Sequence, residues 1–360
     1  MRHWDLLVLV CLLTGCGDAS APPAMSAGRT LIDMAGQEVR LPARVERIGC
    51  LEVLCYEKLF LLGASERIAM MIRTDAPWME RTNPAVTRIQ QLSADPGNEE
   101  LLRQHLDLVF HTTGYPAPGK IERLARMGIP TLVSQTMGSD RFADAAAFVD
   151  SRDRMLRLFG QVLGGDYAAR AEDWCRYHDR MTAMVAERTR DIPPARRVRL
   201  YYVRGPEATK TQGVGSNTYW YGMLAGADMV VGRTPLMGRG DVSLEELLAW
   251  DPQVIAVGRQ YPIDLVTADP RWARVSAVRD GRVYALPDGV FFWDGSSEGV
   301  LLMLYLAKTL YPERFTDLDL RREIRDYYAR FYRYRFSDAE LEDFLQGKGP
   351  DGRRWNGMRN

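Results

Sequence analysis

Short apolar runs separated by helical segments recur along most of this chain, and this alternation restricts its fold more than any other feature. In the first half the runs are VERIGC (45–50), RIAMMI (67–72), LDLVFHT (106–112) and PTLVSQ (130–135). Between the first two runs, VLCYEKLFLLGA (53–64) spaces its apolar residues as a helix does and reaches a stop signal at Gly63. Such alternation is typical of a parallel sheet with helical crossovers, so we predict an α/β lobe over residues 42–165.

The alternation stops in the middle of the chain and then resumes. About 27 residues between Gly165 and Pro193 have helical periodicity and would form one helix about 40 Å long. The later apolar runs are VRLYYV (198–203), QVIAVG (253–258) and GRVYALP (281–287). We therefore predict an α/β fold with two Rossmann-like lobes and mostly parallel sheets, joined by one long backbone helix over 166–192. The second lobe would span 193–346, and the polar, glycine-rich residues 347–360 are expected to be disordered.

The N-terminus has the layout of a secretory signal. Leu6 to Leu13 are eight consecutive apolar residues, too few for the roughly 20 that a membrane span needs. Arg2 precedes this run and small residues follow it. The ending Leu-Thr-Gly-Cys resembles the lipobox of bacterial lipoproteins, which implies a signal over 1–15 and lipidation of Cys16. Residues 16–41 begin with a small, polar stretch suited to a tether. The alternatives are a plain secretory signal with an incidental cysteine and a buried N-terminal helix.

Charge and cysteine content exclude several classes of protein. The chain has 47 basic and 47 acidic residues and no long basic block, so we expect no nucleic-acid partner. Beyond Cys11 and Cys16, three cysteines remain without a CxxC spacing, which indicates neither a disulfide framework nor a thiolate zinc site. Cys50 and Cys55 are either a disulfide across a strand-to-helix turn or two packed thiols.

Enzyme motifs are scarce. The sequence has no HExxH and no P-loop, and GVGSNTYWYG departs from GxGxxG at Thr218. Gly295 to Gly299 match GxSxG with Ser297 at the nucleophile position, but such a hydrolase needs a histidine later in the chain, and the last one is His178. The serines before this apolar run are better explained as a helix N-terminus, so we expect no enzyme.

Ligands of parallel α/β sheets meet the loops at the carboxyl ends of the strands, and here those loops are rich in aromatic residues and arginines. The candidate ligand-binding residues are Tyr56, Arg73, Trp78, His111, Tyr115, Arg204, Tyr219, Trp220, Arg259 and Trp293. Guanidinium groups near aromatic faces suit a planar or anionic ligand. For each aromatic residue the alternative is core packing, for the arginines pairing with nearby acids, and for His111 a structural role in place of metal ligation.

Several segments occur in an order that resembles a known family: the lipobox, LIDMAGQEVRLP, RIGCLEVLCYEKLFLLGASERI, NEELLRQHLDLVF, the mid-chain helix, VSLEELLAWDPQVIAV and DGRVYALP. The chain resembles the periplasmic-binding-protein family that serves ABC importers of ferric siderophores, haem and cobalamin. The resemblance implies a monomer at the periplasmic or extracytoplasmic face, lipid-anchored to the membrane. It would bind a metal chelate, with no covalent cofactor, in the cleft between its lobes and deliver it to a permease. The extension over 311–345 and the FFWDG loop depart from the siderophore and cobalamin subgroups.

Two matching segments, one in each lobe, carry the expected permease contacts. NEELLRQHLDLVF and SLEELLAWDPQVIAV each join an acidic helix start to a buried strand. The resemblance implies that Glu99 and Glu245 pair with permease arginines, or Glu100 and Glu246 if the register differs by one. The alternative is helix stabilisation by acids in the first turn. A lipid-anchored sensor or scavenger without a transporter is the second functional hypothesis, because fold does not fix function. One stiff connecting helix also predicts only slight closure on ligand binding.

Overall fold

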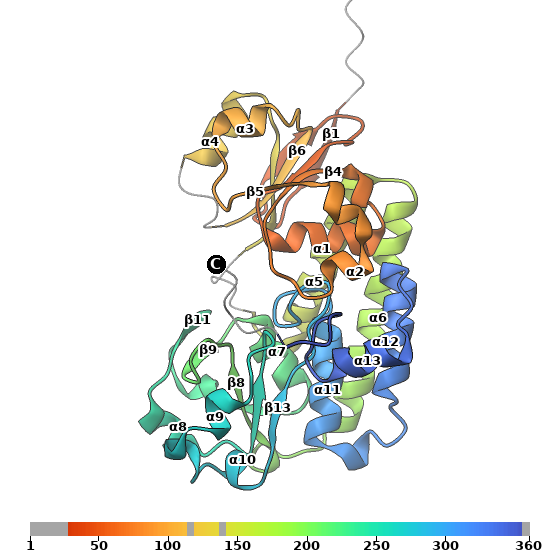
Figure 1. The fold of residues 1–360 in the computed structure, drawn as a ribbon. Coiled ribbons are helices and arrows are strands. Elements are labelled where there is room, and N and C mark those ends of the chain that lie inside the picture. Colours follow the sequence, from red (N-terminus) through yellow and green to blue (C-terminus); the bar gives the residue numbers. More distant parts are fainter. Residues whose placement is uncertain (1–27, 114–118, 137–141, 355–360) are drawn as a thin grey trace, which may run out of the picture.

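The computed structural model describes residues 28–113, 119–136 and 142–354. Two lobes, each built around a parallel sheet, lie one above the other, and long helices run along one side of both (Figure 1). The expected signal, Cys16, residues 16–27 of the expected tether and Tyr115 lie outside the described residues. Within the described part, no helix is both long and apolar enough to cross a bilayer.

The N-terminal lobe contains a five-stranded parallel sheet in the order β5-β4-β3-β6-β7. Its strands are β3 (Ile48–Cys50), β4 (Ile68–Ile72), β5 (Gln90–Leu92), β6 (Leu108–Thr112) and β7 (Thr131–Gln135). Its helices are α1 (Val53–Leu62), α2 (Met79–Thr82), α3 (Asn98–Leu102) and α4 (Lys120–Arg126). An antiparallel hairpin of β1 (Arg29–Ile32) and β2 (Glu38–Leu41) precedes the sheet. This corrects the expected tether over 16–41, because residues 29–41 are folded and Asp33 accepts a hydrogen bond from the Val133 amide of β7. The sheet confirms the alternation predicted from the sequence.

The start and end of α1 follow from its capping residues. The side chain of Glu52 accepts a hydrogen bond from the Leu54 amide, and Gly63 ends the helix in the left-handed conformation with φ 77°. All five residues of β6 are buried, as expected for a central parallel strand with both faces covered. Local sequence therefore fixes the strand-to-helix turn that contributes one wall of the cleft described below.

The C-terminal lobe has a four-stranded parallel sheet in the order β10-β8-β12-β13. Its strands are β8 (Arg199–Val203), β10 (Asp228–Met229), β12 (Val254–Val257) and β13 (Val283–Ala285), and an outer antiparallel pair is formed by β9 (Lys210–Gln212) and β11 (Arg239–Asp241). Its first helices are α7 (Asn217–Leu224), α8 (Leu244–Trp250), α9 (Asp264–Thr267) and α10 (Ser276–Arg279). The last are α11 (Gly299–Leu310), α12 (Leu320–Tyr327) and α13 (Asp338–Leu345), with a π-helical turn at Tyr328–Tyr332.

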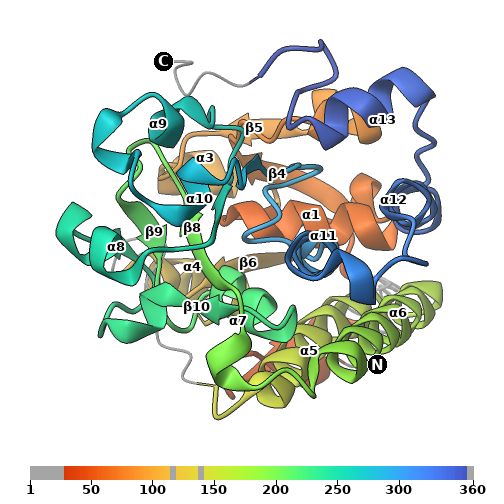
Figure 2. The ribbon, with the colours of Figure 1, turned by 90° about the horizontal axis from the view of Figure 1, so that it is seen from below.

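The expected backbone helix is present as α6 (Asp166–Thr189), 24 residues long, but it is one of a pair. The 19-residue helix α5 (Ala145–Leu163) packs along it, and both run beside the two lobes (Figure 2). A Cβ on Gly160 would lie 2.8 Å from that of Ala171, so the absence of a side chain permits this close approach. Arg157 also forms an ion pair with Glu172 across the two helices.

The C-terminal segment corrects the expectation that residues up to 346 stay with the second lobe. Beyond α12 the chain returns to the first lobe, where the Tyr332 hydroxyl donates to Glu57 of α1 at 2.6 Å. Arg81 of α2 pairs with Glu340 of α13 at 2.7 Å. A single cluster of buried apolar residues runs through both lobes, α6 and this segment. The lobes are therefore held together by more than one helix.

The expected disorder from residue 347 onward is also corrected for 347–354. The Trp78 indole nitrogen donates to the Lys348 carbonyl at 3.0 Å, and Gly347 and Gly349 are buried. Residues 355–360 lie outside the described part of the chain.

Candidate functional site

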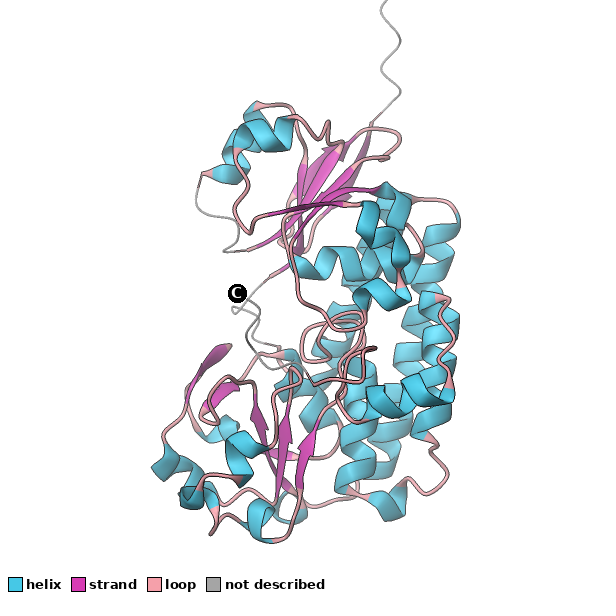
Figure 3. Cartoon of the chain, in the orientation of Figure 1, coloured by secondary structure: helices cyan, strands magenta, loops and turns pink. Residues whose placement is uncertain are grey.

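A cleft of about 630 Å³ lies between the lobes and takes its lining from both. The loops that follow strands of the two sheets face each other there (Figure 3). From the first lobe and α5 the lining residues are Glu52, Val53, Leu54, Ile72, Arg73, Ala94, Thr112, Gln135, Thr136 and Arg152. From the second lobe they are Gln212, Gly215, Ser216, Asn217, Gly238, Arg239, Arg259, Phe291, Asp294 and Gly295. The volume falls within the roughly 300–1,000 Å³ typical of small-molecule sites.

The charge of this lining is mainly positive, because four arginines and two acidic residues contribute to it. Asp294 accepts hydrogen bonds from Arg259 Nε at 2.8 Å, the Tyr202 hydroxyl at 2.9 Å and Gln212 Nε2 at 2.7 Å. Although burial alone would raise the pKa of Asp294, the Arg259 guanidinium holds that pKa below its ordinary value. Asp294 is therefore an ionised counter-charge within the arginine-rich lining.

Arg259 is held firmly in place. Its backbone has φ 56°, in the left-handed region that non-glycine residues rarely adopt, and its guanidinium lies 4.6 Å from the centre of the Phe292 ring. Its carbon stem and charged head are thereby fixed before any ligand arrives. This preorganisation removes part of the entropic cost of binding.

Arg204 and Arg239 add to the positive potential near Arg259. Burial, together with the charges of Arg259 and Arg239, lowers the pKa of Arg204, and its Nε is buried without a hydrogen-bond partner among the described residues. Loss of solvent contact and the charge of Arg259 also lower the pKa of Arg239. Three guanidinium groups thus lie near one shared carboxylate, Asp294, and an anionic ligand would relieve their repulsion.

The opposite wall is the strand-to-helix turn at Glu52. This carboxylate caps α1 and accepts a hydrogen bond from the Ser134 hydroxyl at 2.8 Å, and burial raises its pKa in spite of nearby Lys58. A disulfide joins Cys50 to Cys55 and closes the turn that carries Glu52, Val53 and Leu54. Of the two alternatives for these cysteines, the structure has the disulfide.

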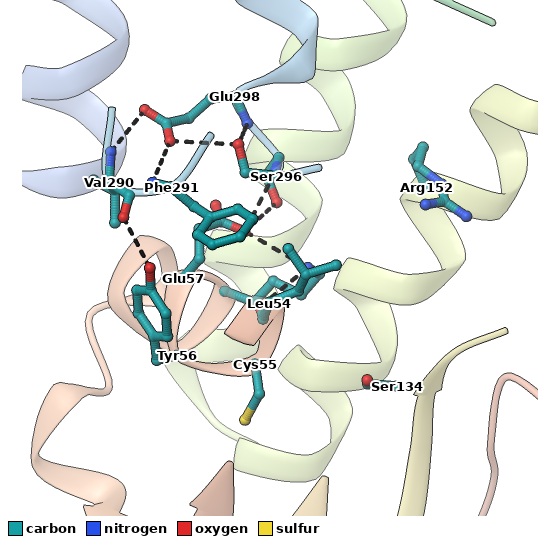
Figure 4. A network of polar contacts seen from close by, with 12 residues as sticks. Leu54, Cys55, Tyr56, Glu57, Ser134, Arg152, Val290, Phe291, Ser296 and Glu298 are labelled. Carbon is teal, nitrogen blue, oxygen red and sulfur yellow. Dashed lines mark hydrogen bonds and ion pairs between the residues drawn. The ribbon is translucent and has the colours of Figure 1, made fainter. Parts of the chain in front are cut away.

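The loop around Phe291 is anchored to the first lobe (Figure 4). The Tyr56 hydroxyl donates to the Val290 carbonyl at 3.0 Å, and the Phe291 amide donates to the Glu298 carboxylate at 3.0 Å. Tyr328 also donates to Glu298, and burial raises the pKa of this carboxyl to about 8. Because this loop carries lining residues, the cleft is coupled to the buried core between the lobes.

Two of the residues predicted from the sequence, Arg73 and Arg259, line the cleft together. Arg204 lies near Arg259 but is not among the residues that line the cleft. Tyr56 is fully buried between the lobes, with its hydroxyl bonded to Val290. His111 is a buried residue of β6, burial lowers its pKa, and no group of three or more His, Cys, Asp and Glu in the described part of the chain could hold a metal ion.

The remaining predicted aromatic residues that the structure describes pack in the protein and do not line the cleft, which corrects the sequence-based expectation. Trp78 packs on Phe336 and Phe344, and Trp293 also packs on Phe344. On α7, Tyr219 and Trp220 contact each other, and Trp220 stacks on Phe148. The large apolar area of an indole or phenol ring is better buried in a core than held at a solvated loop.

Sequence reasoning missed Arg152 and Arg239 as lining residues. Arg152 lies within α5, where its Nη1 donates to Asn217 Oδ1 at 3.2 Å, and an arginine in a helix carries no sequence signal that separates it from a solvent-exposed one. Arg239 lies on the short outer strand β11, which has no apolar run to reveal it. The glycines on either side of Arg239 were the available sequence signal, because a glycine in a strand often marks a place where a ligand or another backbone approaches closely.

Comparison with known proteins agrees with this geometry. The family model described as "Periplasmic binding protein" matches residues 49–290. This chain belongs to the periplasmic binding protein family. As a member of that family it is a solute-binding component of an ABC transporter, with a permease as partner, a periplasmic or extracytoplasmic location and a small ligand held noncovalently. It is not an enzyme, as expected, and Ser297 is buried with its hydroxyl donating to Glu57 at 3.2 Å.

Individual relatives cover most of the chain. The molybdate-binding protein MolA of Haemophilus influenzae is 26% identical over 354 residues, covering 91% of this periplasmic binding protein and 96% of MolA. The structure of MolA bound to molybdate superimposes with a TM-score of 0.76 and covers 86% and 99% of the two chains. A periplasmic solute binding protein from Veillonella parvula, 21% identical, gives a TM-score of 0.75 and covers 89% and 97%, which shows the shared fold.

Proposed function

We propose that this periplasmic binding protein captures a small metal oxyanion of the molybdate class in its interlobe cleft and delivers it to an ABC permease. The observation that carries this proposal is the arginine-rich lining, to which Arg73, Arg152, Arg239 and Arg259 contribute. Arg259 pairs with Asp294 at 2.8 Å, and Arg204 lies close to Arg259 outside the lining. Guanidinium groups bind oxyanions through paired, charge-assisted hydrogen bonds. The MolA structure, which contains molybdate, supports the same ligand class.

Ferric siderophores, haem and cobalamin, the ligands expected from the sequence, suit the lining of the cleft less well than an oxyanion does. Haem and cobalamin would be held in large part by aromatic faces, but Trp78, Trp293 and Tyr56 are buried in the protein, and Phe291 is the one aromatic residue among the described lining residues. An anionic ferric chelate is the second candidate, because the same arginines and the volume of about 630 Å³ suit it.

Isothermal titration calorimetry separates these ligands. We would titrate the purified protein with molybdate, tungstate, sulfate and phosphate, and with ferric citrate, haemin and cyanocobalamin. We expect molybdate and tungstate to bind, with an affinity that weakens as ionic strength rises. Binding of haemin or cyanocobalamin alone would overturn the proposal, and binding of ferric citrate alone would select the second candidate.

We also propose that lipidation of Cys16 keeps the protein at the membrane and that it works as a monomer. The lipobox and the small, polar residues that follow it support the anchor, and the monomer is what the resemblance to the family implies. Cys16→Ser should move the protein from the membrane fraction to the soluble fraction, and a variant that stays with the membrane would exclude this anchor.

Permease docking through Glu99 and Glu245 is part of the same proposal. Both side chains are exposed, and neither carboxylate forms an ion pair with another described residue. The neighbouring Glu246 closes a capping box with Ser243, which gives it a structural role and favours Glu245 as the contact. Exchanging both docking residues for glutamine should abolish uptake and leave ligand affinity unchanged. Unchanged uptake would favour the sensor or scavenger hypothesis.

A further inference from the structure

Three large apolar side chains are exposed among the described residues: Ile32 (65%), Leu102 (46%) and Leu248 (41%). Two of them hold equivalent positions in the two lobes. Single exposed apolar residues are ordinary on protein surfaces and need no explanation by themselves. Here, however, Leu102 is the last residue of α3 in the first lobe, and Leu248 lies in α8 of the second lobe.

The two leucines occupy the same place in a repeated local pattern. Each follows directly after a fully buried leucine, Leu101 or Leu247, which anchors its helix to the lobe. Each also comes three residues after an exposed glutamate, Glu99 or Glu245. Side chains three apart on a helix are neighbours, so both helices present a carboxylate beside an exposed leucine.

The two helices are also equivalent in the fold. The helix α3 precedes β6, which pairs with β3, the first strand of its sheet along the chain. In the same way α8 precedes β12, which pairs with β8. Both helices lie on the side of the molecule away from α6 and α12 (Figures 1 and 2). One surface pattern is therefore displayed twice on one side, once by each lobe.

Neither exposed leucine is explained by the stability of its helix. In α8 the capping box uses Ser243 and Glu246, and core packing uses Leu247. Leu248 therefore has no packing role, and Glu245 forms no ion pair with another described residue, although its place in the first turn suits the helix dipole. In α3 the N-cap is Gly97, which provides no side-chain cap, and Glu99 again forms no ion pair with a described residue. Exposed apolar surface costs free energy unless a partner covers it.

We propose that Leu102 and Leu248 are paired apolar anchors that dock this protein on the permease, each seated beside a basic permease side chain that meets Glu99 or Glu245. The proposal rests on the proposed function. The partner's chemistry follows from the pattern, since an acidic and an apolar group side by side require a cation beside an apolar socket. Because the pattern occurs twice, the permease would present two such sockets, one to each lobe. Glutamates alone on a solvated surface orient a partner more than they hold it, whereas buried leucines add affinity.

The experiment replaces the gene in the source organism with variants and measures uptake of radiolabelled molybdate. The test variant combines Leu102→Ser with Leu248→Ser, and Ile32→Ser is the matched control because it removes an equally large exposed apolar side chain elsewhere. We expect uptake to fall about tenfold or more in the double variant and to be unchanged in the control. The Kd for molybdate and the denaturant midpoint should stay at wild-type values in both, because neither leucine lines the cleft or the core.

The outcomes distinguish a failure of the anchor proposal from a failure of the proposed function. Wild-type uptake that persists after deletion of the gene would overturn the proposed function. Gene-dependent uptake that the double variant preserves would overturn the anchors alone. A photo-reactive amino acid placed at position 102 or 248 gives a readout that does not depend on the ligand. It should cross-link to the permease, and cross-linking solely to a second copy of this chain would assign the surface to self-association and overturn the anchors.

Discussion

Arg259 and Asp294 form a two-point ion pair, with Nε to Oδ2 at 2.8 Å and Nη2 to Oδ1 at 2.9 Å. Their side chains are 13% and 2% exposed. Such a pair links stability to ligand binding, because the arginine that meets an anion is also the one that neutralises a buried carboxylate. Removal of one partner from a buried pair costs about 3–5 kcal/mol.

The two lining arginines predicted from the sequence should respond differently to substitution. Arg259→Ala should lower the free energy of unfolding by about 3 kcal/mol and weaken molybdate binding more than tenfold. Arg73 is exposed and forms no ion pair with another described residue, so Arg73→Ala should weaken binding about tenfold with little change in stability. Denaturant unfolding and calorimetry measure the two quantities. Equal losses of stability in both variants would contradict this account.

The contribution of Glu298 to stability should fall as the pH rises from about 5 to about 8. Burial raises the pKa of Glu298 to about 8, so the folded protein holds a proton there that the unfolded chain releases near its ordinary pKa of 4.5. The folded state therefore binds more protons in this window, and the free energy of unfolding decreases with pH. In Glu298→Gln the decrease in the free energy of unfolding across this window should be smaller, by on the order of a few kcal/mol. Unfolding titrations at several pH values test this, and an unchanged slope in the variant would contradict it.

The disulfide between Cys50 and Cys55 should support the cleft wall. Its replacement by two serines should cost about 2 kcal/mol, because the closed loop is short. It should also weaken ligand binding, since Glu52, Val53 and Leu54 of the cleft wall lie inside that loop. Cys175→Ala is the control, because this free cysteine is buried elsewhere, in α6. Affinity that survives loss of the disulfide would show that the turn is held by the Glu52 cap alone.

The contact between Trp78 and Lys348 should hold the end of the described chain. Trp78→Phe retains an aromatic ring against Phe336 and Phe344 but loses the indole hydrogen bond to the Lys348 carbonyl. We expect faster proteolysis after Lys348 in this variant, with a loss of roughly 1 kcal/mol in stability. Limited proteolysis followed by mass spectrometry detects the cut, and wild-type resistance would argue against a holding role.

Closure on ligand binding should be slight. The two lobes share one buried cluster and are bridged by α5, α6 and the returning C-terminal segment, which resist bending together. Small-angle scattering profiles recorded with and without molybdate should superimpose. A large decrease in the radius of gyration would contradict the shared core.

Much of the fold could be predicted because parallel strands are continuous apolar runs. The predicted run 106–112 contains β6 at Leu108–Thr112, and 253–258 contains β12 at Val254–Val257. The return of the C-terminal segment could not be predicted in this way. Its contacts, such as Tyr332 with Glu57, join residues 275 positions apart, and periodicity reports only local neighbours.

The position of the site could be predicted from the sequence, but only some of its lining residues could. Loops at the carboxyl ends of the strands do form the cleft, and Arg73 and Arg259 were found by that rule. Trp78 and Trp293 come from loops of the same kind, yet these loops fold back on α13 and bury the indoles against Phe344. Arg152 comes from a helix that the rule does not consider.

The returning C-terminal segment also determines when the core of the first lobe can be completed during synthesis. Glu57 and Trp78 belong to the first lobe, but their partners Tyr332 and Phe344 come much later in the chain, and Tyr332 is synthesised 275 residues after Glu57. A growing chain therefore exposes part of the first lobe's interior until the second lobe and the segment beyond α12 have been synthesised. A gene shortened before α12 would therefore yield a chain that contains both sheets but leaves part of the first lobe's core uncovered.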